Sequence, residues 1–548
     1  GALFVPSPFA FAQKARKAAD TAASATDSAH GNLEGITVEQ MKAYLTFIAS
    51  DEMEGRNTPS RGLDLTAKFI EAMLMRWKLK PAGDNGTFFQ KINLSRDKVD
   101  AEKSKVEING KVYDFGESFL AQSVSGKASG QVVYVGSGWV IPSKNINAYQ
   151  VGESKIDVKD KIIVALSGLP KDVLANDLAN GKQGVDWDNA LSYGAKNGAR
   201  AVIFVPSPQV LRAWSRLRNN IVRGNALRVV EGNLQGFNIP TITASENLLK
   251  ALFEGEKESG ENILAKSKTA PAEPFELSPN KKVTINVIAE SERSTTQNVV
   301  AILEGSDPQL KNEYVAIGAH YDHVGNSQQN GCQPVNGDSI CNGADDDGSG
   351  TTGVLAIAEA FANGPRPKRS ILFVWHAGEE KGLWGSDYFT SHPTVPLKQI
   401  VTQLNIDMIG RSRKAGDNSS ANAGLTGPEE IYVIGSKMMS TELGELSESV
   451  NNSYLKLKFN YKYDDPRDTE RLFFRSDHFN YAKNGIPIIF YFDGIHEDYH
   501  KPTDEISKID FEKMERVART VMATAWALAN RAERVKVDKK LPPELSQR

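Results

Sequence analysis

The chain has 548 residues, of which 40% are hydrophobic and 24% are charged, and its formal net charge at pH 7 is -3. This balance is typical of a soluble globular protein with two or three domains and excludes a disordered or membrane-spanning chain. The near-neutral mixture of charges also argues against a nucleic-acid partner, because neutralising phosphates requires a basic face.

The chain opens with an apolar stretch that ends in Ala10-Phe11-Ala12. Its end is similar to a signal-peptidase cleavage site, and the stretch is too short to cross a bilayer. We therefore interpret residues 1–32 as a signal-peptide remnant followed by a flexible leader. This interpretation predicts a secreted or periplasmic protein with no membrane partner. The alternative is a disordered apolar terminus.

Residues 33–122 contain two segments, at 38–50 and 67–77, whose apolar residues recur at helical spacing. We predict that this zone forms the N-terminal part of a domain whose remainder lies further along the chain.

Residues 123–274 alternate strand-like apolar runs with glycine-rich turns; the runs occupy 131–135, 161–165 and 201–205. The zone contains no histidine and no cysteine. This composition argues against a metal or nucleophile site there and favours a binding or lid role for a β-rich inserted domain.

In residues 275–535, short apolar runs repeatedly end in polar clusters, and helical segments lie between the runs. Strands that alternate with helices predict an α/β fold in which a mixed, mostly parallel sheet is covered by helices on both faces. Ligands of such sheets bind beyond the carboxyl ends of the strands, which is where these clusters fall. The apolar positions from Phe511 to Ala529 predict a last helix, and 536–548 is a C-terminal tail.

Seven of the eight histidines follow position 319, and carboxylates crowd the same strand ends. Imidazole and carboxylate groups are the ligands of zinc and similar divalent ions. Each of these clusters alone has a simpler explanation. Glu379 and Glu380 could be a pair of solvent-exposed carboxylates, and the aspartates at 345–347 could form a turn or a calcium-binding loop. Because several strands bring histidines and carboxylates to the same edge of the sheet, we favour a metal site.

Two cysteines, Cys332 and Cys341, bracket a short loop between these stretches. Export would oxidise them, so we predict a disulfide that stiffens a loop at the rim of the site. They do not make a zinc site by themselves, because structural zinc takes four ligands.

Five motifs together resemble the M28 family of metallopeptidases, which includes secreted bacterial di-zinc aminopeptidases, and the 123–274 zone resembles the protease-associated (PA) domain inserted in many members. Two upstream stretches, at 50–56 and 79–84, also resemble the start of these enzymes. The motifs are Gly318-Ala-His-Tyr-Asp322, Asn342-Gly-Ala-Asp-Asp-Asp-Gly-Ser-Gly350, His376-Ala-Gly-Glu-Glu-Lys-Gly382, Asn405-Ile-Asp-Met-Ile-Gly410 and Asp498-Tyr-His-Lys-Pro-Thr-Asp504.

The resemblance implies two zinc ions in a zinc exopeptidase fold. His320 and Asp407 would hold one ion, Glu380 and His500 the other, and Asp346 would bridge them. Of these ligands, Asp346 depends most on the motif alignment, because aspartates flank it on both sides. The resemblance also implies a cis peptide bond between Asp346 and Asp347.

Three further roles follow from the resemblance. Glu379 would be the general base, Tyr499 would donate to the oxyanion of the tetrahedral intermediate, and Asp322 would orient His320. Tyr499 is equally compatible with a packed aromatic residue. The remaining histidines of this region match no ligand position and are interpreted as supporting or structural; they include His323, His376, His478 and His496.

The expected function is removal of residues from peptide or protein N-termini. Alternatives of the same fold are a carboxypeptidase, a dipeptidase or a single-zinc glutaminyl cyclase, and a non-catalytic binding module is the alternative of another class. The sequence contains no nucleophile elbow and no nucleotide-binding glycine motif after a strand. Side-chain preference and oligomeric state are not fixed by any motif.

Overall fold

The computed structural model describes residues 30–178, 183–224, 227–230, 238–266, 272–329, 331–465 and 467–541. The predicted signal-peptide remnant at 1–29 and the end of the tail lie outside these residues. The chain forms two compact units: unit 1 comprises residues 1–92 and 295–548, and unit 2 comprises residues 93–294. None of the helices in the described part combines the length and apolar character that a membrane span requires.

Unit 1 is built on a mixed sheet with the strand order β2-β18-β22-β19-β23-β26-β24-β25. The central strands β22, β19, β23 and β26 run parallel, whereas β18 and β24 are antiparallel to their neighbours β22 and β26. The strands are β1 (Lys80–Pro81), β2 (Phe89–Val99), β18 (Ala289–Leu303), β19 (Tyr314–His320), β20 (Gly325–Asn326), β21 (Ile340–Cys341), β22 (Ser370–His376), β23 (Ile400–Ile406), β24 (Glu430–Ile434), β25 (Lys458–Asn460) and β26 (Ile488–Phe492).

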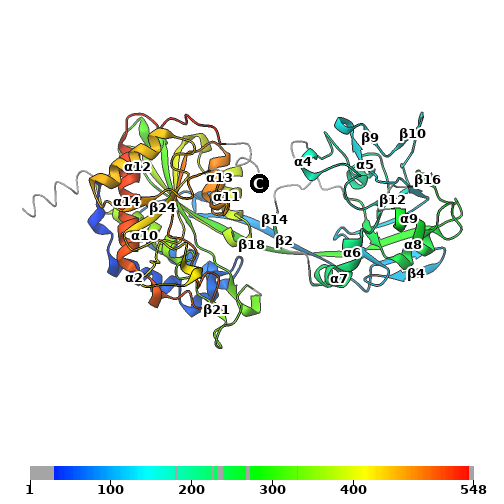
Figure 1. Cartoon of the computed structure of the whole chain (residues 1–548), viewed down its shortest axis with the longest axis horizontal. Helices are drawn as coiled ribbons and strands as arrows, with labels where there is room; N and C mark the ends of the chain where they lie inside the picture. The colour runs from blue at the N-terminus through cyan, green and yellow to red at the C-terminus, as the bar shows by residue number, and fades with distance from the viewer. Residues whose placement is uncertain are drawn as a thin grey trace, which may run out of the picture. The chain divides into compact units, whose positions relative to one another are not determined.

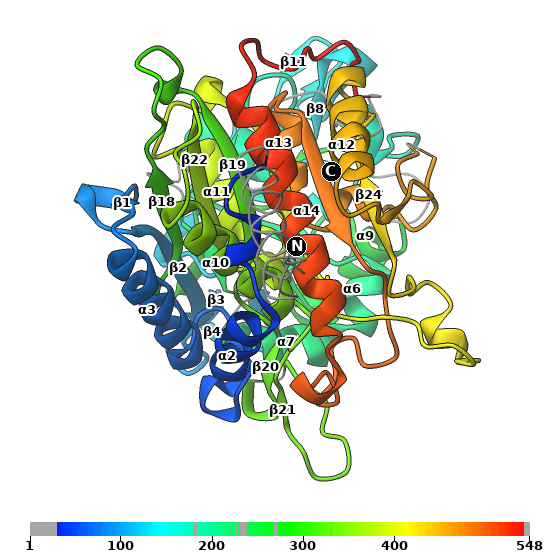
Figure 2. The same ribbon diagram turned by 90° about the vertical axis from the view of Figure 1, so that its left-hand side faces the viewer.

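Helices cover both faces of this sheet, as the sequence predicts. Figures 1 and 2 show α10, α12 and α14 on one face, and Figure 1 shows α11 and α13 on the other. The helices of unit 1 are α2 (Val38–Ile48), α3 (Arg61–Arg76), α10 (Gly348–Ala362), α11 (Trp384–Ser391), α12 (Thr441–Ser453), α13 (His478–Lys483) and α14 (Phe511–Asn530).

The side chains of β22 alternate between two apolar layers, because successive residues of a strand point to opposite faces. Phe373 and Trp375 pack in the core with α10 and α14, whereas Leu372 and Val374 pack with Phe389 of α11. Since both faces are covered, the strand consists entirely of buried residues.

The helix starts are set by capping residues, and this explains where the observed bounds differ from the predicted ones. The predicted helix at 67–77 begins earlier, at Arg61, because the Ser60 hydroxyl accepts a hydrogen bond from the Leu63 amide at 3.2 Å. Likewise α10 begins directly after Asp347, whose carboxylate accepts from the Gly350 amide at 2.9 Å.

Unit 2 contains a six-stranded sheet in the order β16-β7-β12-β13-β15-β5 and a four-stranded antiparallel sheet in the order β4-β3-β17-β6. The runs predicted at 131–135, 161–165 and 201–205 form the parallel strands β7, β12 and β13. Its strands are β3 (Lys105–Ile108), β4 (Lys111–Asp114), β5 (Phe119–Ala121), β6 (Gly126–Gly130), β7 (Val132–Tyr134), β8 (Val140–Ile141), β9 (Ile146–Asn147), β10 (Gln150–Val151), β11 (Ser154–Lys155), β12 (Ile162–Leu166), β13 (Ala201–Val205), β14 (Arg228–Val229), β15 (Thr241–Ala244), β16 (Phe275–Glu276) and β17 (Val283–Val287). Its helices are α4 (Ala175–Leu178), α5 (Ala190–Lys196), α6 (Pro208–Arg212), α7 (Trp214–Arg223), α8 (Glu246–Phe253) and α9 (Gly260–Lys266).

Unit 2 extends beyond the 123–274 zone at both ends. Strands β3, β4 and β5 precede that zone and β17 follows it. They belong to unit 2 because β3 pairs with β17 and β5 pairs with β15. Residues 93–122, expected in the catalytic domain, are therefore part of unit 2.

Candidate metal centre

Four strands of unit 1 deliver the predicted ligands to one edge of the sheet. His320 is the last residue of β19, Asp407 follows β23, and Glu380 and His500 lie in the loops after β22 and β26. Because these strands are parallel, their carboxyl ends meet at the same edge. Asp346 reaches this edge from the loop before α10, and the peptide bond that follows it is cis, as the resemblance implies.

The first group of side chains surrounds one carboxylate oxygen of Asp346. The His320 Nε2 atom lies 3.4 Å from Asp346 Oδ1 and 3.5 Å from Asp407 Oδ1. All three residues are buried, with exposed fractions of 1%, 3% and 6% for His320, Asp346 and Asp407. A nitrogen and two carboxylate oxygens thus face one point.

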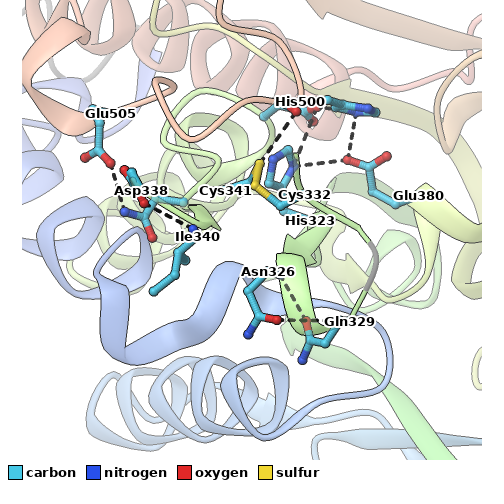
Figure 3. The surroundings of a disulfide bond; sticks show 12 residues. His323, Asn326, Gln329, Cys332, Asp338, Ile340, Cys341, Glu380, His500 and Glu505 are labelled. Carbon is cyan, nitrogen blue, oxygen red and sulfur yellow. Dashed lines mark hydrogen bonds and ion pairs between the residues drawn. A yellow bond between two sulfur atoms is a disulfide. The ribbon is translucent and has the colours of Figure 1, made fainter. Parts of the chain in front are cut away.

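The second group surrounds the other oxygen of Asp346. The His500 Nε2 atom is 3.1 Å from Asp346 Oδ2 and 3.1 Å from Glu380 Oε1. His323 also faces this group, with its Nδ1 atom 3.0 Å from Glu380 Oε1, and Figure 3 shows both imidazoles directed at the Glu380 carboxylate. The structure therefore brings the five predicted ligands together around Asp346, and it adds His323, which the motifs place outside the ligand set.

The two aspartates beside Asp346 are engaged elsewhere. Asp345 Oδ1 accepts from the Gly410 amide at 2.7 Å. Asp347 Oδ1 accepts from the Met408 amide at 3.1 Å, in addition to capping α10. Within the run of three aspartates, Asp346 is the one whose two oxygens face the two groups, which is the geometry of a bridging ligand.

The carboxylates make this edge favourable for positive charge. Burial opposes the charged form of His320, but Asp407 and Asp346 outweigh it and raise the pKa of His320 well above its ordinary value. Burial also opposes charging of His500, yet Asp346 and Glu380 raise its pKa to about 10. A site that stabilises protonated imidazoles in this way meets the electrostatic requirement of a divalent cation.

Buried atoms without partners provide a test of whether these residues fit a metal. Asp346 Oδ2, Glu380 Oε1 and His500 Nε2 are buried and face one another, and outside this group the described residues give them no hydrogen-bond partner. Such atoms are costly unless something pairs with them. A cation bound by all three would satisfy them, and imidazole nitrogen with carboxylate oxygen is a donor set that suits zinc.

Residues 298–525 match the model of peptidase family M28. Within this segment the chain is similar to members of that family. A probable leucine aminopeptidase of Arthroderma benhamiae is 28% identical over 244 residues, which cover 42% of this chain and 57% of that protein. The chain thus spans little more than half the length of this curated relative. Leucine aminopeptidase 2 of Arthroderma otae is 34% identical over 152 residues, 27% of each chain.

Two solved structures are similar over most of their length. The aminopeptidase from Aneurinibacillus sp. strain AM-1 is 18% identical, with 92% of this chain and 97% of that one covered and a TM-score of 0.43. BSAP, a zinc aminopeptidase from Bacillus subtilis, is also 18% identical, with 93% and 99% covered and a TM-score of 0.43.

A cavity at the candidate metal centre is lined by the predicted catalytic residues. Glu379 and Tyr499 line it together with His320, Asp346 and Asp407. Its remaining wall consists of Met408, Leu472, Arg475, Phe490, Phe492 and Ile495.

Both catalytic candidates ionise less readily than usual in this position. Burial raises the pKa of Glu379 well above its ordinary value; His320 opposes this shift, and Glu380 adds to it. Tyr499 stacks on the His500 ring with a centroid distance of 3.9 Å, and burial raises its phenol pKa. Tyr499 therefore packs as an aromatic residue and also borders the cavity.

Asp322 connects His320 with the base. Its main-chain oxygen lies 3.1 Å from His320 Nδ1, closer than its carboxylate at 3.7 Å. The carboxylate instead accepts from the Glu379 amide at 3.1 Å and from the Thr58 hydroxyl at 2.9 Å. Asp322 thus contacts His320 mainly through its backbone, while its side chain holds the Glu379 amide, and its orienting role stays a prediction.

Three of the other histidines lie outside the two groups. His376 contacts Asp477 at 3.4 Å, and His496 contacts Asp345 at 3.3 Å. His478 stacks on Phe490 at a centroid distance of 4.5 Å.

Arg56 is a supporting residue whose role the sequence did not reveal. Its guanidinium is completely buried and donates to main-chain oxygens of Tyr321, Asn342 and Gly343, which flank the metal-site segments. The upstream motif that contains Arg56 was the available signal, but its distant acceptors could not be read from the sequence.

The predicted disulfide between Cys332 and Cys341 is present. It lies beside the second group, and Cys341 Sγ is 3.5 Å from the His500 main-chain oxygen (Figure 3). Both cysteines pack with Val324.

Proposed function

We propose that this protein is a di-zinc aminopeptidase. The observation that carries the proposal is the placement of Asp346, whose two carboxylate oxygens face two separate groups of metal-binding side chains. His320, Asp346 and Asp407 would hold one ion, and Asp346, Glu380 and His500 would hold the other. The names of the curated relatives support aminopeptidase activity over the other reactions of the fold.

When bound, the ions supply Lewis-acid polarisation of the attacking water and of the scissile carbonyl. Glu379 lines the same cavity, so its carboxylate can accept the proton of that water and pass it to the leaving amine. Tyr499 borders the cavity as well, and its hydroxyl is proposed to donate to the oxyanion. Asp322 accepts a hydrogen bond from the Glu379 amide and so holds the backbone of the base in place.

The test is an assay of free aminoacyl substrates beside N-acetylated ones, with zinc quantified in the same samples. The proposal expects turnover of the free substrates and about two zinc ions per chain. Hydrolysis of the blocked substrates alone would refute the aminopeptidase assignment.

Two neighbouring variants separate the base from the ligand. Glu379→Gln is expected to lower kcat by about 10²–10⁴-fold while zinc content stays unchanged. Glu380→Gln, the matched control one residue away, is expected to lose zinc as well as activity. Full activity of Glu379→Gln would show that the base is misassigned.

We also propose that the protein acts outside the cytoplasm and that unit 2 is a PA-like domain that selects substrates. The disulfide supports the location, because such bonds persist in oxidising compartments. Cell fractionation tests the location, and recovery in the cytoplasm would contradict it.

A variant in which a short linker replaces residues 93–294 tests whether unit 2 selects substrates. If it does, the variant should hydrolyse dipeptides at the wild-type rate, but its ratio of kcat/KM between long and short peptides should differ from that of the wild type.

A further inference from the structure

His323 has the position of a metal ligand. Its imidazole is fully buried, and its Nδ1 atom lies 3.0 Å from Glu380 Oε1 and 3.7 Å from Asp346 Oδ2. Candidate ligand atoms of His323, Asp346, Glu380 and His500 all lie within 4.8 Å of one another. Figure 3 shows the His323 and His500 rings converging on Glu380 from two different loops.

Four atoms of this group are orphaned together. His323 Nδ1, Asp346 Oδ2, Glu380 Oε1 and His500 Nε2 are all buried, and apart from their contacts with one another the described part of the chain offers none of them a hydrogen-bond partner. A single buried polar atom that lacks a partner is a local defect. Four such atoms that face one point indicate a binding site for an ion or group that contacts all four. Two nitrogens and two oxygens form a complete tetrahedral shell for zinc.

The backbone and a neighbouring glycine hold the His323 ring in this direction. The His323 amide donates to the Arg56 main-chain oxygen at 3.1 Å. Gly343 lies against the ring so closely that a β-carbon there would be 2.5 Å from His323 Cγ. The ring therefore occupies a fitted slot beside the carboxylates.

The other group has one protein ligand fewer. His320 and Asp407 stand around Asp346 Oδ1, and a carboxylate oxygen of Asp347 also lies near both. We do not count Asp347 as a ligand, because its carboxylate accepts hydrogen bonds from the main-chain amides of His320, Gly350 and Met408. The two metal positions thus differ: the one beside His323 has four protein ligands and the one beside His320 has three.

We propose that His323 is a sixth metal-binding residue and that it makes the two ions unequal. This inference depends on the proposed di-zinc function. The four-ligand position binds its ion tightly and fills first, as closed zinc shells do. The three-ligand position keeps the open coordination place that a catalytic zinc needs, and it is the one lined by the cavity with Glu379.

The test is a zinc titration of the metal-free protein against a competing chelator, combined with zinc K-edge X-ray absorption at one and two equivalents. The wild type is expected to bind in a tight and a weaker step, with two imidazoles around the first zinc. In His323→Asn the tight step weakens by more than about 100-fold, beyond the effect usual for a residue that only orients a ligand. The first zinc then shows one imidazole.

His478→Asn is the matched control, because His478 is a buried imidazole that stacks on Phe490 outside the group. It should leave both steps unchanged. Because His323→Asn could weaken the apo fold, His323→Ala is titrated beside it, and both are compared with the wild type by thermal unfolding in a chelator.

One imidazole around the first zinc of the wild type, or equal zinc affinities of wild type and His323→Asn, would overturn the inference. These readouts need no substrate. A protein that binds two zinc ions but is insensitive to His323 refutes only this inference, whereas a protein that binds fewer than two refutes the proposed function.

Discussion

Replacing Arg56 is expected to destabilise the metal-site loops, because one buried guanidinium joins three segments of backbone. Its donors bind the main-chain oxygens of Ile48 at 2.8 Å, Tyr321 at 3.0 Å, Asn342 at 2.7 Å and Gly343 at 3.0 Å. Burial lowers the pKa of Arg56 to about 10, which leaves it charged at pH 7.

The size of the effect follows from these bonds. A hydrogen bond from a charged donor contributes about 1.5–3 kcal/mol, and the contributions of one side chain are not fully additive. Arg56→Met leaves four acceptors without this donor, so we expect a loss of about 4–6 kcal/mol. Arg56→Lys offers one nitrogen, which can reach one or two of the oxygens, so we expect about 2–4 kcal/mol. Either value is a large part of a domain stability of about 5–15 kcal/mol.

Scanning calorimetry with and without zinc measures this effect, because the two units can unfold separately. Arg56→Lys should lower the Tm of the transition that zinc raises, by about 3–6 °C. Arg61→Lys, at an exposed position of α3, is the control and should not shift it. If Arg56→Lys unfolds within 1 °C of that control, the four bonds do not support the fold as argued.

Three further outcomes are expected. The Cys332–Cys341 disulfide closes a short loop, with a sequence separation of 9, so a double Cys→Ser variant should lose about 2–3 kcal/mol; equal Tm values for wild type and variant would contradict this. Burial opposes ionisation of Glu313, but the ion pairs with Arg369 and Arg534 lower its pKa below the ordinary value. The ionised Glu313 therefore stabilises the folded chain fully above about pH 4.3, the ordinary pKa of a glutamate, and this contribution is lost as the pH falls through the lower pKa of the folded state. Glu313→Gln should therefore cost about 1–2 kcal/mol at pH 7 in urea unfolding, and this difference should vanish in acid; a constant difference would disprove the pairing. Chelation should lower the Tm of the wild type, since the ions bind only the folded chain.

The sequence predicts the strand-borne part of the site well, for a physical reason. His320 and Asp407 end parallel strands, so the fold alone brings them to one edge. His323 lies in the loop after β19, three residues beyond His320. A loop has no regular alternation of side chains, so the sequence does not predict the direction of this imidazole. Its direction depends on Arg56 and Gly343, which are distant in the sequence.

The limits of unit 2 were missed for a related reason. Strand β3 pairs with β17, and Ile108 lies opposite Val283. Composition along the chain detects the central runs of a domain, but it does not detect strands whose partners lie far away. The zone at 123–274 therefore marks the middle of unit 2 and leaves out its edges.

The run of three aspartates shows how a single loop can position a bridging ligand. Asp345 accepts from the Gly410 amide and Asp347 from the Met408 amide, and both amides belong to the segment that follows Asp407. The residues on either side of Asp346 thus tie its backbone to the backbone that carries the facing ligand. The separation between Asp346 and Asp407 is consequently set by two carboxylate–amide bonds and does not depend on the metal alone. An asparagine at 345 or 347 keeps an acceptor oxygen and should preserve this spacing, whereas alanine at either position should weaken zinc binding although neither residue binds it.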